Sequence, residues 1–511
     1  MAEDFKPLIG KNVIETLTLG MYEDARFIYR EYVQNAADQI DIALEEGIIK
    51  HSNEAKIQIT IDRLRRQICI EDNATGIESN LILRFLGDVA KSEKDVRHRK
   101  GFRGIGRLGG LGYCEKLVFE TSFKGESTKS IMTLDAKLLK KIITDRKDET
   151  DASGVISIIT SIVRLPESSD AHYFKVCLEE VTNSLILDIV KVNEYLSMVA
   201  PLPFKPEFTF GKEIKKYFEE NNVSIDEYHI ELNNKQIYKV YKDVIIDKDE
   251  KTTILGVDFL KVRDEAGNLL ALGWFGLRDY VNEVLTNQVI ERGIRLRKNN
   301  IQIGSENTLN RFYKSDRTNF RFIGELHTLS PSFIPNARRD YFNDNKTCQV
   351  FEEALIKIIE KENWENKYAQ KVSKIHNRAK DIEQYKLLVE EYERGKDQID
   401  STAKEKHFSG KLKIAKEKAL NASKEIEKVK RIAEKDLNIK KLYDYIIGNK
   451  DLSFDPDIEK KLKRTIYNPP TFKKLSENET KIARDIIDLI YETVEFKTAE
   501  LLKKKIVDKY N

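Results

Sequence analysis

Three polar residues between positions 30 and 38 have the spacing that puts side chains on one face of a helix. Glu31, Asn35 and Asp38 lie at positions i, i+4 and i+7 of an amphipathic stretch, residues 23–46. Polar groups on a face that packs against a sheet are costly without a ligand. A carboxylate can orient and deprotonate water, and an amide oxygen one turn away can help to hold Mg²⁺. The spacing therefore suits ATP hydrolysis, although an ordinary exposed polar face has the same pattern.

A second polar group follows the strand-like run Gln67–Ile70. The carboxylate of Asp72, at the end of this strand, can accept a hydrogen bond from the amino group of adenine. Gly76, four residues later, lets the backbone approach the base. A plain Asp-Asn turn is the alternative interpretation.

A glycine-rich loop comes next, with Gly101, Gly104 and Gly106 leading into a probable helix. Backbone N–H groups at such a helix start can cradle phosphate. The polar and basic stretch before it, Lys91 to Arg99, can fold over a nucleotide as a lid. A flexible surface loop and a nucleic-acid patch are the other interpretations.

The elements that must position these groups divide the chain into three regions. Residues 1–203 alternate helix and strand signals, and prolines at 201, 203 and 206 mark a boundary. Residues 207–348 are again mixed. Strand-like runs of the two regions are Lys56–Ile61, Gln67–Ile70, Lys116–Thr121, Ser130–Leu134, Val155–Ile162, Tyr173–Leu178, His229–Leu232, Thr253–Val262, Leu269–Gly276, Arg295–Ile303 and Arg321–Leu326.

Residues 349–511 are helical in character. A seam of small and apolar residues at coiled-coil spacing predicts a long helix, with Gly395–Ser401 as the turn of a hairpin; a single solvated helix is the alternative. The seam consists of Leu412, Ala415, Ala419, Ala422, Ile426, Val429 and Ala433. A final helical section runs from Ser476, which forms a capping-box pattern with Glu479, to about Asp508.

Composition limits the class of protein. The 511 residues are 40% hydrophobic and 34% charged, with a net charge of +3, which indicates a multidomain globular chain rather than a general nucleic-acid binder. We expect no membrane span and no signal segment. The four cysteines, Cys69, Cys114, Cys177 and Cys348, are far apart and are interpreted as buried thiols, so a cytoplasmic, reduced protein is expected.

The order and spacing of these motifs resemble the GHKL superfamily (gyrase, heat-shock chaperone, histidine kinase, MutL), and within it the ninety-kilodalton heat-shock chaperones. Their R-E-L-I-S-N-A-S-D motif matches Arg30, Glu31, Asn35, Ala36 and Asp38. Their adenine motif D-x-G-I-G-M is similar to residues 72–77, with Ala74 in place of the first glycine, and their L-G-T-I-A-K-S segment is similar to residues 86–92.

This resemblance implies an α+β chain. It would comprise a two-layer α/β sandwich ATPase domain (1–203), an α/β transducer or middle domain (207–348) and a helical, coiled-coil C-terminal region (349–511). It implies that Glu31 is the general base and Asn35 the Mg²⁺ ligand. It assigns the rest of the nucleotide site to Asp38, Asp72, Gly76, Lys91, Gly101, Gly104 and Gly106.

A further short match lies in the second region. The chaperones have a loop ending N-[IV]-S-R-E, whose arginine reaches the nucleotide; aligning Asn336 and Asp340 places Arg339 on that arginine, with Arg338 as the neighbour left open. A guanidinium there would neutralise charge on the γ-phosphate. The basic run Gly293–Asn300 either lines an inter-domain cleft or is an edge strand protected by charge.

The expected function is a slow, Mg²⁺-dependent ATPase that switches conformation and acts on a protein client, with the C-terminal helices mediating homodimerisation or docking. The alternative is a nucleic-acid clamp, as in MORC, MutL and type II topoisomerases. The near-neutral net charge of the chain disfavours DNA binding, whereas the lysine-rich residues 404–435 favour this alternative.

Overall fold

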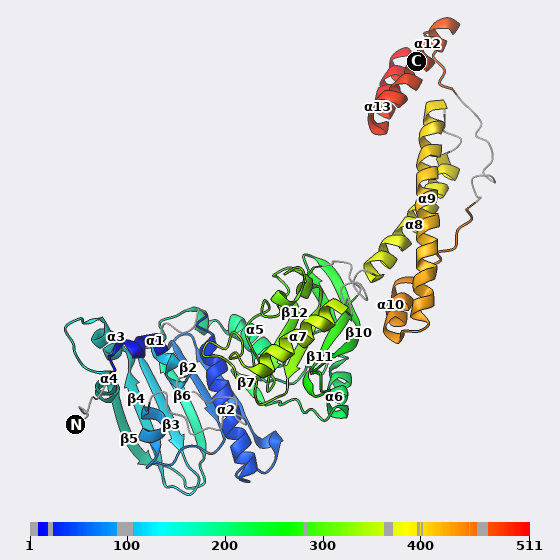
Figure 1. Ribbon diagram of the computed structural model, residues 1–511. Coiled ribbons are helices and arrows are strands. Elements are labelled where there is room, and N and C mark those ends of the chain that lie inside the picture. Colours follow the sequence, from blue (N-terminus) through cyan, green and yellow to red (C-terminus); the bar gives the residue numbers. More distant parts are fainter. Residues whose placement is uncertain are drawn as a thin grey trace, which may run out of the picture. The chain divides into compact units, whose positions relative to one another are not determined.

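The computed structural model describes residues 9–18, 24–88, 106–278, 284–361, 371–395, 399, 402–448, 450–456 and 469–511 (Figure 1). The chain divides into two compact units, residues 1–277 with 284–364, and residues 365–511 with 278–283. None of the helices in the described ranges has the length and hydropathy of a membrane span.

The first unit contains an eight-stranded sheet with the order β5-β4-β3-β6-β2-β1-β7-β8. Its strands are β1 (Ile57–Asp62), β2 (Gln67–Asp72), β3 (Lys116–Ser122), β4 (Thr128–Asp135), β5 (Thr160–Pro166), β6 (Tyr173–Glu179), β7 (Ile230–Leu232) and β8 (Lys235–Gln236). Burial alternates along β2, so that Ile68, Ile70 and Asp72 share the buried face.

Helices cover that face and share its core. They are α1 (Asn12–Thr18), α2 (Phe27–Glu45), α3 (Ala136–Thr144), α4 (Ala152–Ile159) and α5 (Ile189–Val199). Figure 1 shows α2, which packs against β1 and β2. Aspartates cap α3, α4 and α5 by accepting hydrogen bonds from backbone N–H groups of the first turn. The predicted strand Val155–Ile162 is therefore wrong in its first half, because the Asp151 cap starts a helix there.

A six-stranded sheet follows, with the order β13-β12-β14-β11-β10-β9. Its elements are β9 (Val244–Asp247), β10 (Glu250–Arg263), β11 (Leu269–Arg278), β12 (Gly293–Lys298), β13 (Ile301–Gln302) and β14 (Ile323–Thr328), with α6 (Gly211–Glu220) and α7 (Lys346–Lys361). The basic run Gly293–Asn300 forms β12 and its turn. Since β12 lies between β13 and β14 and buries Arg295 and Arg297, the edge-strand interpretation is wrong.

The chain between α5 and β9 crosses from one sheet to the other more than once. The predicted strand His229–Leu232 lies in the second region of the sequence, but it joins the first sheet as β7, where Ile230 pairs with Ile57 in parallel. The chain leaves the first hydrophobic core at residues 202–204, returns to it at 218–228 and leaves again at 237–240. The first sheet is thus completed by strands that follow α6.

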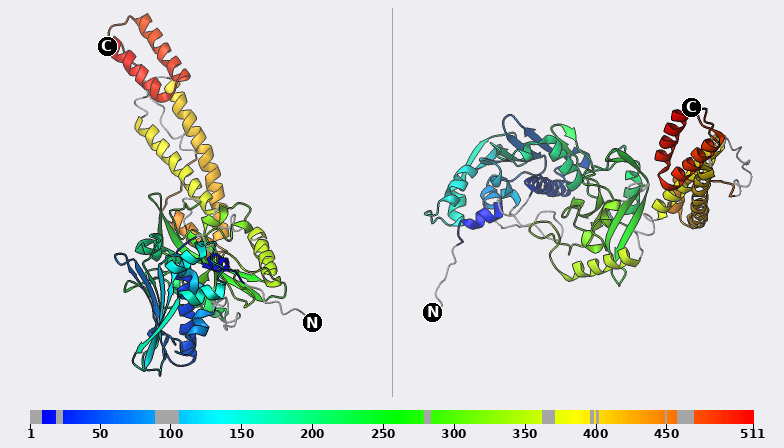
Figure 2. Two further views of the ribbon diagram at one scale, coloured as in Figure 1. Left: turned by 90° about the vertical axis from the view of Figure 1, so that its left-hand side faces the viewer. Right: turned by 90° about the horizontal axis from the view of Figure 1, so that it is seen from above.

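The second unit is helical. It contains α8 (Lys371–Gly395), α9 (Thr402–Ala433), α10 (Leu437–Ile447), α12 (Glu477–Thr493) and α13 (Phe496–Tyr510). Figure 2 shows α8 (yellow) and α9 (gold) side by side. Their shared core contains Ile382, Tyr385 and Val389 of α8 and the seam residues Leu412, Ala419, Ala422 and Ile426 of α9. A single solvated helix is therefore wrong. The capping box of Ser476 and Glu479 is confirmed, but the last helical section is two helices.

The cysteines require a correction. Cys69 on β2 and Cys177 on β6 are register partners and form a disulfide. They are not separate thiols, because the antiparallel pairing brings together residues 108 positions apart in the sequence. Cys114 and Cys348 are buried thiols, and burial raises their pKa values to about 12 and about 11.

Candidate active site

The face of α2 that carries the predicted chemistry is turned into the protein. Glu31 and Asp38 are buried and Asn35 is half-buried. Glu31 and Asp38 are seven residues apart, which corresponds to about 10 Å along a helix. The first turn of this face meets the glycine-rich segment, and the later turn meets the segment that follows Asp72.

Asp72 ends β2 on the buried face, and the turn after it lies against α2. The Asp72 Oδ1 atom accepts a hydrogen bond from the Ala74 N–H at 3.1 Å, and the Thr75 hydroxyl donates to Gln39 Oε1 on α2 at 2.9 Å. Gly76 has a φ of +70°, and a Cβ there would lie 1.9 Å from the Ser122 carbonyl oxygen. Close approach to β3 therefore requires this glycine, a reason that the sequence does not reveal.

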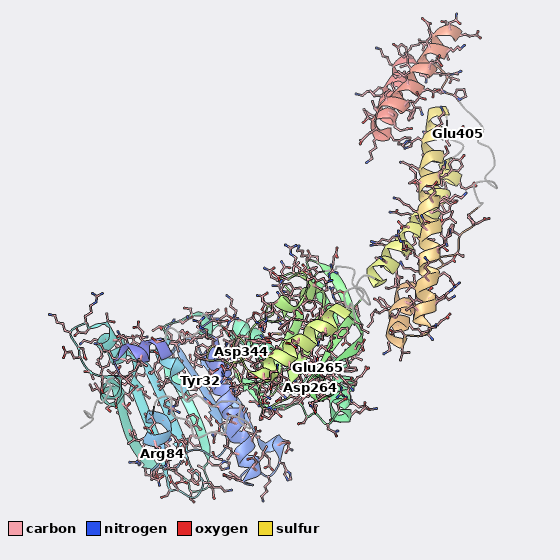
Figure 3. All side chains as sticks on the ribbon, viewed as in Figure 1. Tyr32, Arg84, Asp264, Glu265, Asp344 and Glu405 are labelled. Atoms are coloured by element: carbon pink, nitrogen blue, oxygen red, sulfur yellow. A yellow bond between two sulfur atoms is a disulfide. The ribbon has the colours of Figure 1, made fainter. Side chains whose placement is uncertain are left out.

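The segment after the glycine loop is a 3₁₀ helix, η3 (Gly106–Gly112), packed on the first turns of α2. A Cβ at Gly106 would lie 2.4 Å from Glu31 Oε2, and one at Gly110 would lie 2.5 Å from the Tyr32 hydroxyl. Tyr32, labelled in Figure 3, fixes this contact: its hydroxyl donates to the Arg107 carbonyl at 3.0 Å and accepts from the Gly110 N–H at 3.1 Å.

Sequence reasoning missed Tyr32 and Gly110. The repeated glycines of η3 were the available signal, because glycine is needed where a backbone contacts a buried side chain closely. Lys91, Gly101 and Gly104, predicted for the lid and the phosphate loop, lie outside the described residues.

Arg339 lies at Glu31, although 308 residues separate them. Its Nε is 2.7 Å from Glu31 Oε1 and its Nη2 donates to Oε2 at 3.3 Å, and both side chains are buried. The first contact is an ion pair and the second a hydrogen bond, so the guanidinium neutralises the buried carboxylate. Arg338 is exposed. The structure thus brings the predicted base together with Arg339 rather than its neighbour.

The loop holds Arg339 in a left-handed conformation with a φ of +56°. Its N–H donates to the Asn336 carbonyl at 3.1 Å and its own carbonyl accepts from the Gly304 N–H at 2.8 Å. The Asn336 amide donates to the Asp340 carboxylate, so the two residues that anchor the motif match close the loop. A non-glycine residue at positive φ is uncommon and is retained where the surroundings hold it.

The ion pair of Glu31 and Arg339 has a chemical consequence. Both carboxylate oxygens face the guanidinium, and the Arg30 Nε lies 3.8 Å from Oε1. In this arrangement Glu31 is engaged by arginine and is not available to activate water. Removing either partner would leave a buried charge, at a cost of about 3–5 kcal/mol.

The described residues contain no cluster of three or more His, Cys, Asp or Glu side chains that could hold a metal ion. Mg²⁺ commonly binds one or two protein oxygens together with phosphates and water. The half-buried amide of Asn35, one turn from Glu31, fits such a ligand.

Comparison with known proteins points to one family for the N-terminal part of the chain. Residues 36–154 match the family described as histidine kinase-, DNA gyrase B-, and HSP90-like ATPase. The chain is 27% identical over 134 residues to the chaperone protein HtpG of Chromobacterium violaceum, which covers 23% of this chain and 21% of HtpG. It is 25% identical over 179 residues to HtpG of Anaplasma marginale, which covers 29% of this chain and 28% of HtpG.

The match covers 21%, 22% and 28% of the HtpG proteins of Chromobacterium violaceum, Buchnera aphidicola and Anaplasma marginale, so the chain spans less than a third of the length of these curated relatives. The matched segment begins at Ala36, one residue after Asn35. It includes Asp38, Asp72 and the glycine-rich segment. Residues 36–154 therefore match a GHKL ATPase domain, and the chain is distantly similar to the ninety-kilodalton heat-shock chaperones.

Proposed function

We propose that the protein binds and hydrolyses ATP with Mg²⁺ and uses the cycle to switch the conformation of a chaperone-like molecule acting on a protein client. The observation that carries the proposal is the buried pairing of Glu31 with Arg339 beside Gly106. An acid, an arginine and a glycine-rich backbone at one point are the groups that phosphoryl transfer to water requires.

Each group has a role in the proposed reaction. Asp72 accepts a hydrogen bond from the adenine amino group, in a pocket completed by Asp38 and Gly76. Lys91, Gly101, Gly104 and Gly106 hold the phosphates, and Asn35 contributes to Mg²⁺, which neutralises phosphate charge when bound.

Arg339 connects binding to chemistry. The γ-phosphate competes with Glu31 for the guanidinium, because a triphosphate carries more charge than one carboxylate. Transfer of Arg339 to the phosphate frees Glu31 to direct water for in-line attack. Turnover is slow, since this exchange precedes each hydrolysis. ATP shifts the conformation only to the extent that it binds the exchanged state better.

The proposed organisation has an ATPase domain (1–203, completed by β7 and β8), a transducer domain that supplies Arg339 (207–348 apart from those two strands) and a coiled-coil C-terminal region (349–511). The interlacing of β7 and β8 supports a tight connection between the first two.

Replacing Asp72 by asparagine is expected to weaken ATP binding about 10- to 100-fold. The amide oxygen can keep the hydrogen bond from Ala74, so the turn survives, but the other position becomes a donor and repels the adenine amino group. Calorimetry with a non-hydrolysable ATP analogue measures the effect. The control is Glu71→Gln, which changes the neighbouring carboxylate on the opposite face, where it pairs with Lys175 at 3.4 Å. Equal affinity of both variants would remove Asp72 from the site.

A nucleic-acid clamp is the second candidate. The exposed lysines of α9 favour it, among them Lys406, Lys413, Lys418 and Lys424. An ATPase assay with and without duplex DNA separates the candidates: a chaperone-like switch is indifferent to DNA, whereas a clamp is stimulated, with steep sensitivity to salt.

We infer a homodimer through the C-terminal helices. Ile482, Ile486 and Leu489 of α12 are 58%, 50% and 62% exposed and lie on one face at helical spacing, while its opposite face packs on α13. Ile486→Glu is expected to convert a dimer into a monomer, as measured by light scattering at micromolar protein concentration. Thr498→Glu adds the same charge at an exposed position of the neighbouring helix α13 and should leave the mass unchanged. A monomeric unaltered protein would contradict the inference.

A further inference from the structure

A fully buried group of charged and polar residues lies on the second sheet. Glu325 of β14 is 0% exposed. Its Oε2 atom accepts a hydrogen bond from Lys239 Nζ at 2.6 Å and lies 3.0 Å from His327 Nε2, and its Oε1 atom forms an ion pair with Arg297 Nε at 2.5 Å. The Asn300 amide oxygen accepts a second hydrogen bond from Lys239 at 2.7 Å. These five residues are called the Glu325 cluster below.

The cluster is tied to each of the chain segments that interlace the two sheets. Arg297 Nη2 donates to the Met198 carbonyl, at the end of α5, at 2.6 Å. The Asn300 amide donates to the Asp226 carbonyl, before β7, at 2.6 Å. Lys239 itself lies on the last passage, and its N–H donates to the Pro203 carbonyl at 2.9 Å. Each segment that connects the two sheets is therefore bonded to a residue of the Glu325 cluster.

The buried charges of the cluster are tolerated only when each one keeps its partner. Burial, followed by repulsion from Arg297, lowers the pKa of Lys239 to about 7, and burial lowers the pKa of His327 to about 4. Burial alone would raise the pKa of Glu325, but Arg297 and Lys239 outweigh it and hold that pKa well below its usual range. Such a cluster adds little net stability, yet losing one partner is costly. It therefore favours one arrangement of the segments.

A short segment, residues 300–304, connects the cluster to the Arg339 loop. Asn299 and Asn300 form the turn of the β12–β13 hairpin, with φ of +49° and +57°. After β13, the Gly304 N–H donates to the Arg339 carbonyl at 2.8 Å, and the Gln302 amide donates to the Gly304 carbonyl at 2.9 Å. Gly304 has a φ of +68°, and a Cβ there would lie 2.5 Å from the Asp340 carbonyl oxygen, so the hairpin and the arginine loop are in tight contact.

We propose that Asn300, held by the Glu325 cluster, is a positioning residue that sets the β12–β13 hairpin against the Arg339 loop and so delivers the arginine to the Glu31 site. This inference rests on the proposed ATPase function. Asn300 touches no reacting group and acts through Arg339. A displacement of the guanidinium by about 1 Å would be enough to slow chemistry strongly.

The test is Asn300→Gly, which removes both side-chain hydrogen bonds while accepting the positive φ. The matched control is Asn299→Gly, the same change at the adjacent turn position, which also has a positive φ and is not one of the five cluster residues. We expect N300G to lower kcat about tenfold with the Kd for a non-hydrolysable ATP analogue unchanged within about twofold, and N299G to leave both unchanged.

A double-mutant cycle identifies the route. In an Arg339→Ala background, N300G should cause no further loss of kcat, because its effect passes through the arginine. A tenfold loss in both backgrounds, or an equal loss from N299G, would overturn the inference. If N300G is too unstable for kinetics, Asn300→Asp replaces it with the same criteria, since aspartate tolerates positive φ but cannot donate to the Asp226 carbonyl.

The outcomes separate this inference from the function on which it rests. If the unaltered protein hydrolyses ATP and R339A is slow but N300G is not, the positioning role alone is wrong. If the unaltered protein hydrolyses no ATP, the proposed function fails and the positioning role fails with it.

Discussion

Replacement of Glu31 by alanine is expected to reduce ATP hydrolysis about 10³-fold while ATP binding persists, because the carboxylate acts on water and not on the nucleotide. Single-turnover hydrolysis and calorimetry with ATP measure the two quantities. Hydrolysis at the parental rate would remove Glu31 from the role of general base.

The same variant should show a second effect that depends on the ion pair. Without Glu31, the buried guanidinium of Arg339 has lost its carboxylate, so the free variant should be less stable than the parental protein. ATP supplies a γ-phosphate to that guanidinium and ADP does not. The increase in melting temperature caused by a non-hydrolysable ATP analogue, relative to ADP, should therefore be larger in the variant than in the parental protein. Equal increases would show that the γ-phosphate does not reach Arg339.

Arg339→Ala is expected to lower kcat by about 10²–10³-fold with near-normal ATP affinity, since a guanidinium at the γ-phosphate stabilises charge that grows in the transition state. Arg338→Ala is the matched control, because Arg338 is the adjacent arginine and is exposed. Steady-state kinetics on both variants check the assignment. An equal loss from R338A alone would transfer the role to Arg338.

The parts of the site that the sequence predicts are those encoded by local spacing. The three polar residues of α2 follow from helical periodicity, and Asp72 follows from its place at the end of an alternating strand. The Arg339 motif was visible only by resemblance, and its meeting with Glu31 depends on the fold of both sheets.

The parts that could not be predicted depend on contacts between distant segments. The return of β7 to the first sheet rests on the pairing of Ile230 with Ile57, and a three-residue strand has too few residues for a periodic signal. Glu325 lies in the predicted strand Arg321–Leu326, and nothing in the sequence indicates that its carboxylate is buried. Its burial depends on Lys239 and Arg297, which neutralise it from elsewhere in the chain. The helix α4 and the strand β5 share one apolar run, whose periodicity does not distinguish the two.

The interlaced connection limits how the protein can be divided. A fragment that stops at residue 203 would lack β7, leaving the outer edge of β1 without its partner strand and the apolar side chains beneath Ile230 and Leu232 exposed to water. A fragment that stops after β8 would instead carry α6 and its aromatic side chains without the sheet that buries them. Neither fragment would contain all the residues of its own core, so we expect the two sheets to unfold in one cooperative transition.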